Sequence, residues 1–163
     1  PPLFQNAIVQ SLAGGNTMTF NAAACELLCE AGTDLDIVAH DWWLYKMVTG
    51  AGGRAIYDPE PALLYRQHDR NEIGSNGSAR AKLVRAKAVW GNRFVRWNDR
   101  DIKALERCEN LLTRENRRTL ELFKEIREAK GHKAAVLLRK SLIYRQTTGG
   151  DLSLFAAAFM GKL

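Results

Sequence analysis

Asp41 is the side chain in this sequence that is best suited to catalysis, because it stands where a helix is predicted to begin. The positive end of a helix dipole favours an ionised carboxylate. An ionised carboxylate beside a sugar hydroxyl can act as a general base, a role typically worth about 10² to 10⁴ in rate. Residue type alone favours a simpler interpretation, a helix cap, since Asp performs that role very often.

Aromatic and imidazole side chains flank Asp41. Trp42 and Trp43 point about 100° apart on a helix, so they cannot both face one place. One of them, for which we take Trp42, offers a flat apolar platform on which a sugar ring could stack. Packing in the core is the simpler interpretation of both indoles. His40 is either a further polar contact to a substrate or only an exposed neighbour.

Arg66 and His68 form a second candidate group. They lie on the same face if residues 62–68 form a strand, because side chains alternate along a strand. A guanidinium can hold a diphosphate with two hydrogen bonds, and an imidazole can bind a divalent metal. Without a known partner, a histidine at a strand end is more often just hydrogen-bonded, so the structural interpretation of His68 stays open.

Other metal-binding patterns are weak. Asp-x-Asp occurs at residues 34–36 and 99–101, in a predicted loop and at a predicted helix start, where acidic residues are common anyway. Cys25 and Cys29 are one helical turn apart, but no second pair of ligands for zinc follows. An odd number of cysteines without a disulfide framework fits a reducing cytoplasm.

The elements that must position these residues differ between the two halves of the chain. The first half predicts helices over 22–30, capped by Asn21, and over 41–49, and two short strands over 54–57 and 62–68 around Asp58–Pro61. From residue 79 onward the pattern is helical. Helices are expected to begin at a cap on Asn98 or Asp99 and at Thr113. A further helix is expected over about 133–146, and Asp151 would cap a last helix over 152–160. The sequence therefore predicts an α+β, mainly helical fold.

Charge divides the chain at the same place. Residues 1–78 hold four Lys/Arg and nine Asp/Glu, a net charge of −5, and residues 79–163 hold twenty and nine, a net charge of +11. A basic half can face an anionic membrane, nucleic acid or a phosphate-bearing substrate, or it can be a set of well-solvated helices. With 46% hydrophobic residues the chain can bury a core, and no apolar run is long enough to span a membrane.

Four motifs in order resemble the C-terminal half of family 2 glycosyltransferases, in particular the bacterial rhamnosyltransferase-like members that build surface polysaccharides. The motifs are Gly14–Asn21, His40–Tyr45, Gly52-Gly53, and Tyr65–His68 followed by Asn71 and Gly74. The resemblance covers residues 3–75 strongly and the helical remainder more loosely. It implies a GT-A fold whose acceptor-side portion is residues 1–78, followed by a basic helical extension over 79–163.

The resemblance also implies a mechanism. Asp41 matches the base that deprotonates the acceptor hydroxyl, which then displaces the nucleotide diphosphate of a nucleotide-diphospho-sugar with inversion. His68 matches a region that contacts metal or diphosphate, with Arg66 adjacent, and Gly14, Gly15 and Asn16 match a segment near the acceptor. A divalent metal, Mg or Mn, is implied for the full-length enzyme. The nucleotide-binding half would precede Pro1, so we expect this chain alone to be inactive.

Two functions stay open on the sequence. The first is the acceptor-side portion of an inverting glycosyltransferase that acts on a glycan or lipid-linked acceptor, in the cytoplasm or at the inner face of the plasma membrane. The second is a non-catalytic basic helical module that binds an anionic membrane surface or nucleic acid. The glycosyltransferase is the favoured function, because motif order weighs more than composition. Nucleic acid is not an expected partner.

Overall fold

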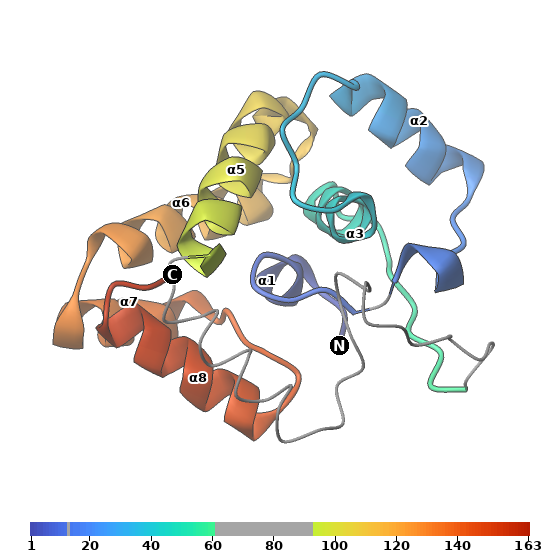
Figure 1. Cartoon of the computed structure of the whole chain (residues 1–163). Helices are drawn as coiled ribbons and strands as arrows, with labels where there is room; N and C mark the ends of the chain where they lie inside the picture. The colour runs from blue at the N-terminus through green and yellow to red at the C-terminus, as the bar shows by residue number, and fades with distance from the viewer. Residues whose placement is uncertain (13, 61–92) are drawn as a thin grey trace.

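The computed structural model describes residues 1–12, 14–60 and 93–163. In chain order its elements are α1 (Phe4–Ala7), the 3-10 helix η1 (Gly15–Thr17), α2 (Ala22–Ala31), α3 (His40–Gly50), α5 (Arg93–Arg107), the 3-10 helix η2 (Glu109–Leu111), α6 (Arg114–Glu128), α7 (Gly131–Ser141) and α8 (Thr148–Phe159). In Figure 1, α3 is seen nearly end-on near the centre with α1 beside it, and α7 and α8 form one edge. The prediction of a mainly helical fold is confirmed.

Local caps start two of the predicted helices where the sequence placed them. The Asn21 side chain accepts a hydrogen bond from the Ala24 N–H (3.0 Å), and the Thr113 hydroxyl accepts one from the Asn116 N–H (3.2 Å). Each cap satisfies a first-turn donor that has no partner within the helix. α2 ends at Gly32, whose φ of +86° is accessible to glycine at little cost.

Three predicted helix boundaries in the second half are wrong. α5 runs without a break through Asn98 and Asp99, because the Asn98 side chain is buried and the Asp99 carboxylate pairs with Arg127. Near residue 142 the helix stops early, since Leu142 is left-handed (φ +58°) and its side chain is exposed rather than in the core. Asp151 does not cap α8: the Thr147 side chain does, accepting from the Gly150 N–H (3.0 Å).

The predicted strand over 54–57 is also wrong. Within the described ranges no residue is in a strand, and Ile56 and Tyr57 are exposed. A strand needs a neighbour to satisfy its backbone groups, and the described part of the chain offers none here. The second predicted strand, 62–68, lies outside the described residues. The GT-A fold therefore stays a prediction.

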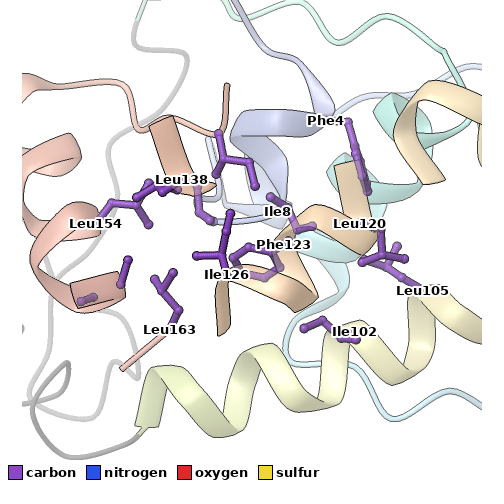
Figure 2. Close-up of a cluster of buried hydrophobic side chains, with 14 of the residues drawn as sticks. Phe4, Ile8, Ile102, Leu105, Leu120, Phe123, Ile126, Leu138, Leu154 and Leu163 are labelled. Carbon is purple, nitrogen blue, oxygen red and sulfur yellow. The ribbon is translucent and has the colours of Figure 1, made fainter. Parts of the chain in front are cut away.

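One hydrophobic core joins the segments on either side of residues 61–92 (Figure 2). Phe4 and Ile8 of α1 meet the apolar stripes of the later helices, and the members labelled in the figure are Phe4, Ile8, Ile102, Leu105, Leu120, Phe123, Ile126, Leu138, Leu154 and Leu163. Burial of a large apolar side chain is worth about 1.5–3 kcal/mol, so this core holds α1 and α3 against the helical array.

The C-terminal end of α3 is closed by the start of α6. The Asn116 side-chain amide donates to the carbonyls of Thr49 (3.0 Å) and Gly50 (2.9 Å), and the Thr113 N–H donates to the Gly50 carbonyl (3.0 Å). The last carbonyls of a helix have no partner within it, so these bonds replace water at a buried site.

Replacing Asn116 by Ala is expected to lower the free energy of unfolding by about 1–3 kcal/mol, because the buried carbonyls of Thr49 and Gly50 each lose one of two hydrogen bonds. Urea unfolding followed by circular dichroism measures the change. Asn110→Ala, at an exposed position in η2, is the matched control and is expected to shift stability by less than about 0.5 kcal/mol. Equal effects of the two substitutions would contradict the role of Asn116.

Candidate active site

Asp41 lies in the first turn of α3 and is partly exposed. Its Oδ1 accepts a hydrogen bond from the Trp42 N–H (2.7 Å), and its Oδ2 accepts one from the Gly15 N–H (3.0 Å). The N-cap residue is Ala39, so the cap interpretation holds only in the sense that Asp41 accepts one first-turn N–H. A carboxylate offers about four acceptor positions, so two bonds leave room for a hydroxyl donor.

The glycine loop of η1 lies against this carboxylate, although it is 26 residues away in sequence. The loop is closed by bonds to the Gly14 carbonyl from the Thr17 N–H (3.0 Å) and hydroxyl (2.9 Å). Asn16 is exposed on the same turn. The structure thus brings the loop of Gly14, Gly15 and Asn16 against the turn that carries His40 and Asp41.

Gly15 and His40 approach each other so closely that a larger residue at position 15 would require the His40 ring to move. A Cβ on Gly15 would lie 2.4 Å from the His40 Nε2. The absence of a side chain at this position therefore allows the loop to reach Asp41 past the imidazole.

Gly15→Ala is expected to displace the exposed His40 ring and to change the chemical shifts of its imidazole in NMR spectra. Because an exposed imidazole can swing away, the free energy of unfolding should fall by no more than about 1 kcal/mol, the low end for overpacking. The double variant Gly15→Ala/His40→Ala removes the clash and should regain wild-type stability. An unchanged His40 spectrum in Gly15→Ala would contradict this close approach.

Both tryptophans after Asp41 are buried. Trp42 is 7% exposed and Trp43 is 6% exposed. The Trp42 indole N–H donates to the Ala7 carbonyl (2.6 Å), and its ring meets Trp97 edge-to-face with centroids 6.4 Å apart. In this structure Trp42 presents no open ring face on which a sugar could stack, so its packing matches the simpler interpretation, a core residue.

A buried ion pair supports the other side of α3. Lys46 is fully buried, forms an ion pair with Asp101 of α5, and lies 3.6 Å from the centre of the Trp42 ring. The other Asp101 oxygen accepts a hydrogen bond from the Val38 N–H (3.1 Å). Asp101 therefore holds both α3 and the segment just before it. These contacts position the first turn of α3, which carries Asp41.

Burial lowers the pKa of Lys46 to about 8, against the opposing attraction of Asp101. In the unfolded chain Lys46 has its ordinary pKa of 10.5 and keeps its proton to higher pH. The unfolded state thus binds more protons above about pH 8, and this group makes stability rise as pH increases.

We expect the urea midpoint of the wild-type chain to rise between about pH 8 and pH 9 relative to that of Lys46→Met/Asp101→Asn, which lacks both charges. Above pH 9 the raised pKa values of Cys108, Tyr45 and Tyr144 oppose the trend, so the comparison belongs below that limit. A parallel pH profile for the two proteins would contradict the lowered pKa.

Arg66 and His68 lie outside the described residues, so their proximity to Asp41 stays a prediction. In the parts that the structure describes, no group of three or more His, Cys, Asp or Glu side chains could hold a metal ion. His68, the residue expected to contact the metal, lies outside the parts searched, so the divalent metal stays a prediction. Two surface hollows among the described residues are lined by Arg127 and by Arg100, and neither is lined by Asp41.

Comparison with known proteins adds one match. Over 54 residues the chain is 42% identical to a dTDP-rhamnosyl transferase, RfbG, of Shigella flexneri. This similarity supports a glycosyltransferase-like relationship. The match covers 33% of the chain and 19% of the length of that transferase. No family model matches, and no solved structure matches.

Proposed function

We propose that this chain is the acceptor-side portion of an inverting glycosyltransferase and that Asp41 is its general base. The observation that carries the proposal is the pairing of the partly exposed Asp41 carboxylate with the Gly15 N–H of the glycine loop. This pairing joins two of the motifs that resemble family 2 enzymes. The similarity to a dTDP-rhamnosyl transferase supports the same class of reaction.

In the proposed step an acceptor hydroxyl gives its proton to Asp41 while its oxygen bonds to the anomeric carbon of the donor sugar. The bond from that carbon to the diphosphate breaks, and its electron pair leaves with the nucleotide diphosphate. Attack opposite the leaving group inverts the anomeric configuration. A base must lie within hydrogen-bonding reach of the proton that it removes, and the Gly15 and Trp42 N–H groups hold the carboxylate in place for this.

His40, Gly14 and Asn16 would line the acceptor side of this site in the proposal, since all three are exposed and flank the Asp41–Gly15 contact in the sequence. Arg66 and His68 would contact the donor diphosphate. The proposal includes a divalent metal bound by the longer enzyme. The role of Asp41 as the base does not depend on that metal.

The test uses the longer protein that contains this chain, incubated with dTDP-rhamnose and a lipid-linked or free saccharide acceptor. The named substrate of the similar transferase makes dTDP-rhamnose the first donor to try. Release of nucleotide diphosphate together with an inverted glycosidic linkage, read by NMR of the product, is the expected result. Retention of anomeric configuration would reject Asp41 as the base of a single displacement.

Ion pairing weakens the nucleic-acid alternative. Several basic side chains of the second half are paired with acidic ones: Arg100 with Asp36, Arg107 with Asp34, Arg127 with Asp99, and Lys124 with Glu106 and Glu121. A patch that binds a phosphate backbone needs basic groups whose charge is not already neutralised.

A further inference from the structure

α8 is apolar on both of its sides, which is unusual for a helix at the surface of a domain. Its inner side packs into the core through Leu154, Ala157 and Ala158. Its outer side, here called the α8 outer face, consists of Leu152, Phe155, Ala156, Phe159 and Met160, all exposed. These residues recur at helical spacing, so they form one stripe. Leu152 is 68% exposed and Phe159 is 57% exposed.

The C-terminal segment that contains this stripe is basic. Residues 129–163 contain six Lys/Arg and one acidic residue, Asp151, a net charge of +5. Asp151 accepts a hydrogen bond from the Arg145 N–H (2.6 Å), so its carboxylate is already engaged. α7 packs against α8 (Figure 1), and its exposed residues include Lys133, Arg139 and Lys140. An apolar stripe and a basic helix thus form one hairpin.

We propose that the α8 outer face docks on the surface of an anionic phospholipid membrane. Its apolar side chains would enter the boundary between headgroups and acyl chains, and the lysines of α7 would face the anionic headgroups. No helix in the described ranges is long and apolar enough to cross a bilayer, so the contact described here is a surface contact.

The charge of the hairpin distinguishes a membrane from a second copy of this chain. A symmetric dimer through α8 would place the same surface on both sides of the interface and bring two basic α7 helices near each other. Like charges across an interface oppose association. An anionic lipid surface has the opposite sign and suits both the stripe and its surroundings. The proposal goes beyond the proposed function and does not depend on transferase activity.

The test is co-sedimentation of the 163-residue chain with phosphatidylcholine vesicles made with and without phosphatidylglycerol. We expect binding to the anionic vesicles and a strong reduction on neutral ones. Leu152→Ser/Phe159→Ser should lower the partition coefficient at least about tenfold, because two large apolar side chains are lost from the contact. Lys133→Gln and Lys140→Gln should each lower it about fivefold.

The matched control is Ile56→Ser, which removes an apolar side chain that is 79% exposed and lies outside α8. It should bind vesicles like the wild type. Circular dichroism shows whether each variant is folded, and the lysine variants test the charge independently of the apolar change. Absent binding to anionic vesicles would overturn the proposal, as would binding that the serine variant leaves intact. A dimer that the serine substitutions dissociate would overturn it in favour of a second copy.

Discussion

Asp41→Asn is expected to lower turnover of the longer protein by about 10² to 10⁴-fold while leaving donor binding close to wild type. The amide cannot accept a proton from the acceptor hydroxyl, but it has nearly the same size. Its oxygen can keep one of the two bonds from the Gly15 and Trp42 N–H groups. The measurement is steady-state release of nucleotide diphosphate, with donor affinity from calorimetry.

A matched control and a stability measurement separate a lost base from a damaged fold. Asp34→Asn removes a carboxylate that is fully exposed on the loop before α3, and it should leave turnover unchanged. Loss of one hydrogen bond in Asp41→Asn should cost only about 0.5–1.5 kcal/mol of stability. Wild-type turnover in a folded Asp41→Asn protein would remove Asp41 from the mechanism.

Lys46→Met is expected to lower the free energy of unfolding by about 3–5 kcal/mol, the largest stability effect predicted for this chain. The substitution leaves the Asp101 carboxylate buried, at 4% exposure, without its counter-charge. Native chains are stable by only about 5–15 kcal/mol, so much of the folded population should be lost on mild warming. Urea unfolding at pH 7 measures the change.

The double variant Lys46→Met/Asp101→Asn tests whether the isolated charge is the cause. It removes both charges and keeps an oxygen for the Val38 N–H, so it should recover most of the lost stability. Lys103→Met, at an exposed position on the same helix as Asp101, is the control and should change stability by less than about 0.5 kcal/mol. A double variant as unstable as Lys46→Met would show that charge isolation is not the reason.

The sequence predicted those helix starts that a local cap determines, because such a cap acts within one turn. Asn21 and Thr113 bond to donors three residues on, so their roles are local. Asn98, Asp99 and Asp151 have the same residue types as good caps. Tertiary contacts decide their roles instead: Asp99, for example, pairs with Arg127 of α6, which no local pattern specifies.

The candidate site shows the same difference between what local sequence specifies and what tertiary contacts decide. The sequence named Asp41, Gly15 and His40 through motif order, and the structure brings them together. Sequence reasoning did not find the buried ion pair of Lys46 and Asp101 that positions them. Lys46 stands four residues after Trp42, and Asp101 stands four residues after Trp97 and four before Leu105, so each interrupts an apolar face. A charged residue on such a face predicts a buried partner, but helical periodicity cannot identify which residue 55 positions away supplies it.

The closure of α3 by Thr113 and Asn116 limits how such proteins can be recombined. Consider a hybrid that takes residues 1–60 from one relative and residues 93–163 from another. The carbonyls at the end of α3 would come from one parent, and the N–H groups at the start of α6 that bind them would come from the other. The segment that carries Asp41 and the C-terminal helices should therefore be inherited together. Grafting the Asp41 segment onto a foreign scaffold would require the first turn of α6 as well.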